Sequence, residues 1–547
     1  MNTKFLNKVF ERDDDVKNSF LRGTYMLTAA AFIVKIFGFI YVIPFVAMVG
    51  EQKYILFEYA YKPYIILLSV ATLGIPNAVS KFVSKYREKG DFHVIKALLH
   101  SGTVIVTIMG ALSFLALYLG ADVVASWLID PNDKTGNSLE DVSYVIRMIS
   151  YALIIVPLLA MTRGFIQGYQ SMGPTAISQI IEQIVRIVII LLGTYLIVNV
   201  FDGTAVQAVG LATFSAFISA LVALLIVFWY LLKRDYNLKG VKGEVSYLGL
   251  YKELVIYAIP FVFVGLSIPL FQSIDTFMIN NVLMTKGYHL GEAETINALV
   301  SLIQKIVVIP VALATAFSVS LVAYITKSYQ GNRTDEVREH INQALKVLMY
   351  FVLPSVAGML ILARPIFTAV YGTTHINDGG QLMAWYAASA FFYSMFSVTS
   401  AILQGMDQQK WVVYSLIAGI IVKIVTNYPL ILVFNGEGTA ISTYVGFAIA
   451  IAIQMYFIQK IGKYKWSENI SAVLSIIKQT IVVGLALLPL GFASFYYDSY
   501  LAQASLLIIG LCIAGVIYLI LSYRNETLFE VIPKRKVDNL LKKIKVK

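Results

Sequence analysis

Charged residues are scarce in this sequence of 547 residues. Only 14% of the residues are Asp, Glu, Lys or Arg, whereas about a quarter of the residues in a soluble globular protein are charged. Hydrophobic residues make up 58% and the mean hydropathy is +0.74. Apolar runs of about 20 residues, the length that crosses a bilayer as a helix, recur from one end to the other. The composition therefore predicts a polytopic membrane protein.

Residues that carry most metal and nucleotide chemistry are also few. The single cysteine, Cys512, excludes an intramolecular disulfide and a Cys-based metal site. The five histidines do not occur in an HExxH pattern, and no GxxxxGK phosphate loop is present. No predicted loop is long enough for a soluble catalytic domain. We therefore predict no metal site, no cofactor and no enzymatic activity.

The apolar runs predict fourteen transmembrane helices. A membrane β-barrel would show short alternating segments instead. The N-terminal segment lacks a short apolar core followed by small residues, so we expect no cleaved signal peptide. The predicted spans are residues 23–48, 55–80, 97–120, 142–162, 175–199, 205–232, 254–284, 295–326, 347–372, 381–405, 411–434, 438–459, 471–495 and 501–522.

Basic residues predict the orientation of these spans. With a cytoplasmic N-terminus, 33 of the 43 Lys and Arg residues fall in predicted cytoplasmic segments. Only four fall on the outer side: Lys53, Lys134, Lys286 and Arg364. Basic residues collect on the cytoplasmic side of membrane proteins. We therefore predict an even number of spans and two cytoplasmic termini. The +11 net charge is ascribed to topology and not to nucleic-acid binding.

An internal repeat relates the two halves of the chain. Three residues recur 243 positions later, namely Lys62, Thr72 and Tyr86 as Lys305, Thr315 and Tyr329. The pair Gln167-Gly168 and Arg186 recurs 237 positions later as Gln404-Gly405 and Lys423. The repeat predicts two pseudo-symmetric six-helix lobes with a substrate site between them. The predicted domains are an N-lobe at 1–235, a C-lobe at 236–465, spans 13 and 14 at 466–523, and a basic tail at 524–547.

Six basic side chains lie at spanning depth, where each costs about 3 kcal/mol if it faces lipid. They are Lys35, Lys62, Arg147, Arg186, Lys305 and Lys423. The acidic residues at similar depth are Glu58, Glu182 and Asp275, which we predict as charge partners. Glu182 and Arg186 are four residues apart and so share a helix face. Arg147 lies near a span end and can reach the interface.

The excess of basic residues predicts a net positive cavity. We assign Lys35, Lys62, Lys305, Arg186 and Lys423 as substrate-binding residues. A positively charged, dry cavity suits an anionic substrate, and phosphate is the usual partner of lysine and arginine.

Three stretches resemble a known family of transporters. They are RGFIQGYQSMGPTAISQIIEQIVRI at 163–187, LRGTYMLTAAAFIVKIFGFIYVIPF in the first span and YAYKPYIILLSVATLGIPNAVSKFVSKY in the second. All three resemble the polysaccharide-biosynthesis and sporulation-protein branch of the multidrug/oligosaccharidyl-lipid/polysaccharide flippase superfamily. Within that branch the chain looks like the lipid II flippases of Gram-positive bacteria.

The resemblance implies a function and a location. It implies a flippase that carries a polyprenyl-pyrophosphate-linked cell-wall precursor across the bacterial plasma membrane by alternating access. The last two helices would form a groove for the polyprenyl tail. Lys35 and Lys305 occupy the positions of arginines in that family. Tyr41 replaces another family arginine, a charge that Lys62 would supply. The expected partners are the lipid-linked oligosaccharide and membrane lipids, and the expected state is a monomer.

Other functions remain open at this point. Related proteins move other polyprenyl-linked glycans. A cation-coupled multidrug exporter of the same superfamily would have twelve spans and a prominent buried carboxylate, for which Asp275 is the candidate. A membrane glycosyltransferase would need a carboxylate base and a sizeable outer loop. The absence of a phosphate loop leaves the membrane potential or an H⁺ or Na⁺ gradient to drive transport.

Overall fold

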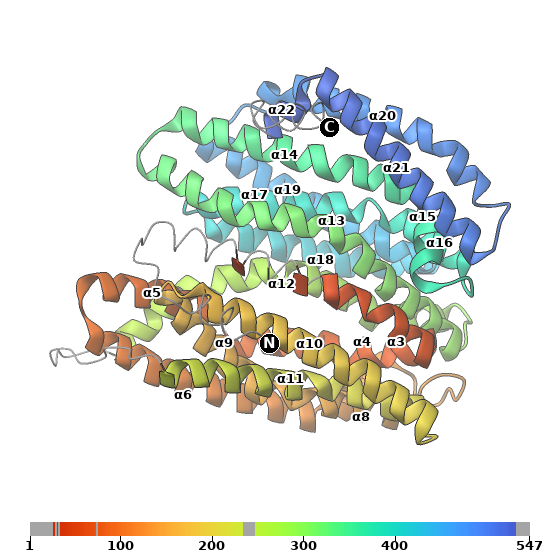
Figure 1. Ribbon diagram of the computed structural model, residues 1–547, viewed down its shortest axis with the longest axis horizontal. Coiled ribbons are helices and arrows are strands. Elements are labelled where there is room, and N and C mark those ends of the chain that lie inside the picture. Colours follow the sequence, from red (N-terminus) through yellow and green to blue (C-terminus); the bar gives the residue numbers. More distant parts are fainter. Residues whose placement is uncertain are drawn as a thin grey trace, which may run out of the picture. The chain divides into compact units, whose positions relative to one another are not determined.

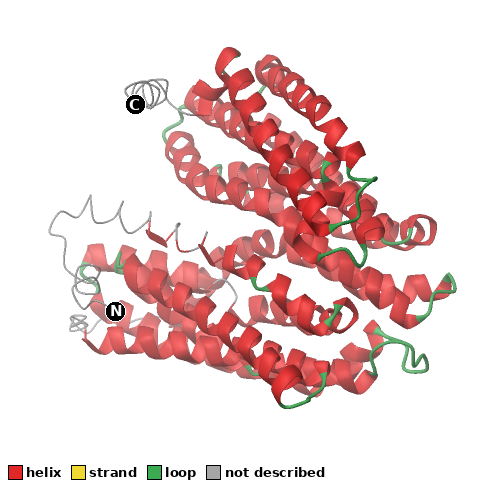
Figure 2. Cartoon of the chain, turned by 45° about the vertical axis from the view of Figure 1, so that its right-hand side comes forward, coloured by secondary structure: helices red, strands yellow, loops and turns green. Residues whose placement is uncertain are grey.

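The protein is built from helices. The computed structural model describes residues 26–27, 30, 33–34, 36–72, 75–233 and 247–531. Within these ranges every regular element is a helix, and short loops join them (Figure 2). The predicted all-α membrane fold is therefore confirmed.

The chain divides into two compact units, one that ends at Ala298 and one that begins at Leu299. The boundary lies inside α13 (Leu290–Gln330; Figure 1), whose first residues belong to unit 1. The other helices of unit 1 are α3 (Val42–Val49), α4 (Glu51–Thr72), α5 (Ile75–Lys89), α6 (Phe92–Leu119), α7 (Ala121–Leu128), α8 (Leu139–Ser150), α9 (Ala152–Gly168), α10 (Met172–Tyr195), the π-helix η1 (Leu196–Val200), α11 (Ala205–Lys233) and α12 (Tyr247–Thr285).

Unit 2 continues with the second half of α13 and ends at a short helix, α22. Its helices are α14 (Thr334–Ile361), α15 (Ala363–Tyr371), α16 (Ile376–Tyr386), α17 (Ser389–Gly405), α18 (Gln409–Phe434), α19 (Glu437–Gly462), the 3₁₀ helix η2 (Trp466–Asn469), α20 (Ile470–Ala493), α21 (Tyr500–Arg524) and α22 (Thr527–Val531). The repeat-based division into lobes at 235/236 differs from the packing boundary and stays a prediction.

Fourteen spans fit the described helices. Twelve helices in the described ranges are long and apolar enough to cross a membrane. The predicted span 55–80 corresponds to α4 and α5, and the described end of the predicted span 23–48 is the apolar helix Ile36–Val49. The chain is thus a multi-pass membrane protein.

Helix boundaries repeat along the chain as the sequence predicts. The pair α6–α7 begins 242 residues before the pair α14–α15, and α6 and α14 also end 242 residues apart. The start of α8 precedes the start of α16 by 237 residues, and the end of α9 precedes the end of α17 by the same number. The break between α16 and α17 is two residues long. The change in offset falls in the loops after α7 and α15. The two halves therefore have the same helix order, and α20 and α21 follow as an addition.

A close glycine contact repeats together with the helices. In unit 1, a Cβ atom built on Gly168 would lie 2.6 Å from the Cβ of Val83 and 2.9 Å from the carbonyl oxygen of Ser80. In unit 2, one built on Gly405 would lie 2.8 Å from the Cβ of Ile325. Only glycine lets α9 approach α5, and α17 approach α13, this closely.

We therefore expect Gly168→Ala and Gly405→Ala each to destabilise the protein by about 1–3 kcal/mol, the usual effect of overpacking. Gly358→Ala in α14 is the matched control, because nothing lies within 4 Å of the added Cβ. Thermal unfolding in detergent would measure the difference. Equal melting temperatures for the three variants would contradict the contact.

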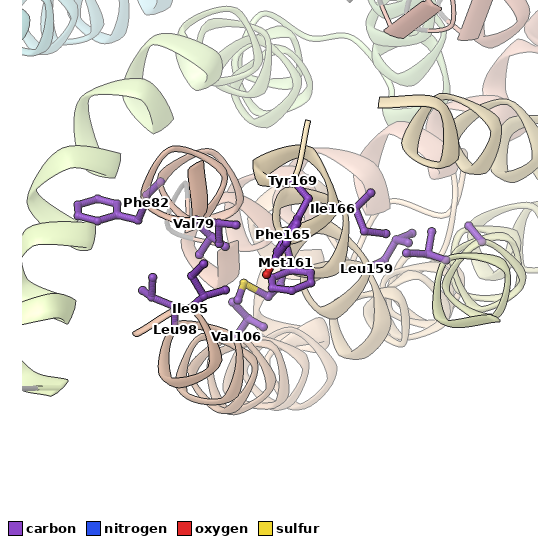
Figure 3. Close-up of a cluster of buried hydrophobic side chains, with 14 of the residues drawn as sticks. Val79, Phe82, Ile95, Leu98, Val106, Leu159, Met161, Phe165, Ile166 and Tyr169 are labelled. Atoms are coloured by element: carbon purple, nitrogen blue, oxygen red, sulfur yellow. The ribbon is translucent and has the colours of Figure 1, made fainter. Parts of the chain in front are cut away.

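A buried apolar cluster packs around the contact between α5 and α9 in unit 1. Residues of α5, α6, α9 and α11 form it, with Val83, Phe165 and Ile166 almost inaccessible to solvent. Figure 3 shows Met161 and Phe165 of α9 beside Ile95 and Val106 of α6, with Ile166 on the other side of α9. This packing fixes α9, which carries one of the charged side chains described below.

Several predicted boundaries were wrong in detail. The span expected at 347–372 begins at Thr334, and the one expected at 142–162 continues to Gly168. Helix-forming polar residues extend these helices beyond the apolar segment, which hydropathy alone does not detect. Pro63, Pro310 and Pro354 lie inside continuous helices.

Candidate functional site

Lys62, one of the predicted binding residues, forms a buried ion pair. The residue lies in α4 with its side chain buried, and its Nζ is 3.3 Å from Oε2 of Glu58 one turn earlier. Tyr54 donates a 2.6 Å hydrogen bond to the other oxygen of Glu58. Lys62 also donates to Oε1 of Gln272 in α12, at 3.4 Å. One face of α4 thus holds a neutralised ammonium group that α12 also contacts.

A second cluster in unit 1 contains two guanidinium groups and one carboxylate, and we call it the arginine triad. Glu182 accepts from Arg186 at 3.1 Å with one oxygen and from Arg163 at 2.9 Å with the other. Each arginine also donates a hydrogen bond to a hydroxyl group, Arg163 to Ser178 and Arg186 to Ser219. The three charged side chains are 13–18% exposed. The arginine triad has a formal charge of +1.

Arg163 was not among the predicted site residues. The predicted span ended one residue before it, so it was assigned to a cytoplasmic loop. The structure continues α9 to Gly168 and turns Arg163 toward α10. Its Nη2 atom is buried without a hydrogen-bond partner among the described residues. Arg163 is the first residue of the RGFIQG stretch that resembles the transporter family, and this position was the sequence feature that could have identified it.

Lys305 lies in the part of α13 that belongs to unit 2. It is partly buried, one turn before Pro310 and beside the buried Gln304. Gln304 donates to the hydroxyl of Tyr386 in α16, at 3.4 Å. Lys305 is thus more accessible than Lys62, its counterpart in the repeat.

Lys423 in α18 is fully buried. Its ammonium group donates to the carbonyl oxygen of Thr439 at 2.9 Å, to Ser442 at 3.0 Å and to Thr443 at 2.7 Å, all in α19. An ammonium group has three N–H donors, and these three contacts use them. The repeat partner Arg186 likewise donates to a hydroxyl of the next helix. Arg186 therefore connects α10 to α11, and Lys423 connects α18 to α19 in the same way.

The remaining predicted residues are placed as follows. Asp275 is buried in α12, three residues from Gln272, whereas Lys35 lies outside the described residues. Glu58 and Glu182 contact Lys62 and Arg186 as described. The four proposed binding residues that the structure describes are divided between the units, with Lys62 and Arg186 in the first and Lys305 and Lys423 in the second.

A buried carboxylate that was not predicted lies at the start of α13. Glu294 accepts from the backbone N–H of Asn137 at 2.9 Å, and its Oε1 has no partner among the described residues. Nearby, Asp133 accepts from Thr135 and from the backbone N–H of Leu290 at 2.9 Å. Hydrogen bonds from Thr135 and Leu290 lower the pKa of Asp133 to about 2. The loop 129–138 is therefore attached to the first turn of α13.

Comparison with protein families and curated proteins gives a consistent result. The model of the family described as polysaccharide biosynthesis protein matches residues 20–317, and the MatE model matches residues 260–429. The lipid II flippase MurJ of Bacillus subtilis (strain 168) is 36% identical over 95% of this chain and 98% of its own length. Stage V sporulation protein B of the same organism is 24% identical over 74% of this chain and 77% of its own.

Solved structures show the same fold. A lipid II flippase MurJ in an inward closed conformation matches with a TM-score of 0.66 and 14% identity, over 92% of this chain and 99% of the other. An inward-facing multidrug resistance transporter of the MATE family, in the MOP superfamily, matches with a TM-score of 0.63 and 13% identity over 81% and 96%.

Proposed function

We propose a function from the premise that this chain belongs to the polysaccharide biosynthesis protein family and is a homologue of the lipid II flippase MurJ of Bacillus subtilis. It is a flippase that moves a polyprenyl-pyrophosphate-linked cell-wall precursor, lipid II, across the membrane by alternating access. The observation that carries this proposal is the 36% identity over nearly the whole of both chains. No covalent bond is made or broken, so the protein is a transporter and not an enzyme.

Basic residues inside the membrane are proposed to bind the pyrophosphate. Lys35, Lys62 and Lys305 contact it, because lysine ammonium groups are mobile point charges that suit phosphate oxygens. The triad residue Arg186 assists through its charge. Lys423 also acts through its charge, since its three N–H donors are already bound to α19. The helices α20 and α21 hold the polyprenyl tail.

The membrane potential is the proposed energy source. An inside-negative potential draws the cationic, empty site toward the cytoplasm, with about 2.3 kcal/mol for each charge and each 100 mV. An H⁺ or Na⁺ gradient is the alternative. The protein works as a monomer in the bacterial plasma membrane with both termini in the cytoplasm.

Complementation tests the proposed substrate. The chain is expressed in a bacterium depleted of its own lipid II flippase, and outward-exposed lipid II is assayed with an externally added enzyme that cleaves it. We expect restored growth and restored cleavage. Failure of a correctly inserted chain to restore either would reject lipid II and favour another polyprenyl-linked glycan.

A multidrug exporter is the second candidate, because the MatE model matches residues 260–429. It predicts drug resistance that depends on the buried Asp275. Loss of resistance in Asp275→Asn together with intact resistance in Lys305→Ala would favour that function.

A further inference from the structure

Arg163, the member of the arginine triad that lies in α9, has a position that the fold itself determines. Phe165, two residues further along α9, is buried in the apolar cluster that α5, α6, α9 and α11 form. The guanidinium group of Arg163 contacts α10, where Nε donates to Ser178 at 2.9 Å and Nη1 is 2.9 Å from Oε2 of Glu182. Packing of α9 and contacts with α10 therefore hold this charge in place without a ligand.

Arg163 has no unused donor that a ligand can reach. Its Nη2 has no hydrogen-bond partner among the described residues, but this atom is buried. The other two nitrogens are bound to Ser178 and Glu182. Arg163 can therefore influence a bound anion only through its charge and through Glu182.

Arg186 is placed differently within the same triad. Its side chain is 18% exposed, with Nη2 bound to Glu182 and Nε to Ser219. Among the described residues, no hydrogen bond from its Nη1 is shown. An anion can thus approach Arg186, and the arginine side chain suits the oxygens of a phosphate group.

The triad lies beside the helix that carries Lys62. Arg186 interacts electrostatically with Tyr61 and Tyr64 of α4, and Tyr61 directly precedes Lys62. Lys62 is paired with Glu58 in that helix, so its charge is offset. The triad therefore adds positive charge to a part of unit 1 that already holds a predicted binding residue.

The charge of the triad depends on how Glu182 is shared. Each of its two oxygens serves a different arginine, but one carboxylate offsets only one guanidinium group. Without Arg163, Arg186 and Glu182 would form a neutral pair of the i, i+4 type. With Arg163, one positive charge remains, and in a partly buried site it is screened much less than at the surface.

We propose that Arg163 is a positioning residue of the pyrophosphate site. By pairing with one oxygen of Glu182, it leaves the charge of Arg186 uncompensated for a ligand that carries a pyrophosphate. The inference rests on the flippase function proposed above, and it adds a residue that acts on the substrate without touching it.

Binding of a short polyprenyl pyrophosphate to the purified full chain in detergent tests this role. The probes are farnesyl pyrophosphate and farnesol, which share one tail and differ in the charged group. Arg163→Gln is expected to weaken binding of farnesyl pyrophosphate about tenfold, because one unit charge is lost close to the ligand. Binding of farnesol should not change. Arg163→Lys keeps the charge and should keep most of the affinity.

Arg147→Gln is the matched control. It removes one positive charge from the same unit, but Arg147 belongs to a partly exposed ion pair with Asp122. We expect it to bind farnesyl pyrophosphate as the wild type does.

A double variant separates the charge of Arg163 from a structural role. Arg163→Gln/Glu182→Gln removes one charge of each sign and restores the net charge of +1 that the single variant loses. We expect it to recover the affinity for farnesyl pyrophosphate, whereas a side chain needed only for packing would not be rescued by a second substitution. Melting temperatures in detergent show that each variant is folded.

Three results would overturn the proposal. They are unchanged binding in Arg163→Gln, equal losses in Arg163→Gln and Arg163→Lys, and a folded double variant that still binds weakly. Equal binding of both probes by the wild type would overturn the anion site itself. Complementation by the wild type tests the flippase function separately, so its success together with any of these results would reject only the role of Arg163.

Discussion

Lys305→Ala is expected to abolish complementation while the protein still inserts and accumulates. Lys305 is partly accessible in α13, so a ligand can approach its side chain, whereas Lys423 is fully buried and donates to three oxygens of α19. Removing a buried partner of a phosphate group costs about 2–5 kcal/mol of binding. The measurement is growth, together with outward-exposed lipid II, at matched expression levels.

Two further variants make this result specific. Lys305→Arg keeps the positive charge and is expected to retain part of the activity, although arginine is not equivalent to lysine in shape. Lys327→Ala removes an exposed lysine near the end of the same helix and is expected to rescue as well as the wild type. Equal rescue by Lys305→Ala and Lys327→Ala would show that the site does not need Lys305.

Lys62→Met is expected to destabilise the fold as well as stop transport. It removes the ammonium group that pairs with the buried carboxylate of Glu58, which also accepts a hydrogen bond from Tyr54. Breaking a buried pair in this way costs about 3–5 kcal/mol. The double variant Glu58→Gln/Lys62→Met removes both charges and is expected to recover most of the stability but not the transport.

Thermal unfolding in detergent and the complementation assay together measure these two effects. Arg333→Met is the matched control, because Arg333 and Glu336 form a 2.8 Å ion pair that is about half exposed. An exposed pair contributes at most about 1 kcal/mol. If Lys62→Met and Arg333→Met had the same melting temperature, the buried ion pair would not contribute to stability more than an exposed one. If the double variant still transported lipid II, Lys62 would not be a binding residue.

The halves of the molecule illustrate how much of the fold was predictable. The recurrence of Gln167-Gly168 at Gln404-Gly405 predicted two related halves, and α9 and α17, which end at those glycines, recur at the same offset. Glycine favours the end of a helix and allows another helix to approach closely, and because this effect depends on the residue type it can be read from the sequence. The contact partners Val83 and Ile325 were not predictable, because they depend on which helix lies alongside.

The charged residues show the limit more clearly. Their cost in a membrane identified Lys62 and Arg186 from the sequence, and the i, i+4 spacing indicated Glu182 as a partner of Arg186. Spacing within one helix does not reveal contacts between helices. Arg163 was therefore missed, and the addition of its charge turns a neutral pair into a triad with a charge of +1.

The sequence by itself determined the helical membrane class, the span count and the internal repeat, because each depends on local composition and periodicity. Tertiary structure alone decided how the charges are used. It bound the ammonium of Lys423 to three oxygens of α19, brought Lys62 to Gln272 of a distant helix, and placed Arg163 of α9 against Glu182 of α10. The cost of a buried charge is fixed by the residue type, but whether it is satisfied depends on atoms that only folding brings within hydrogen-bond distance.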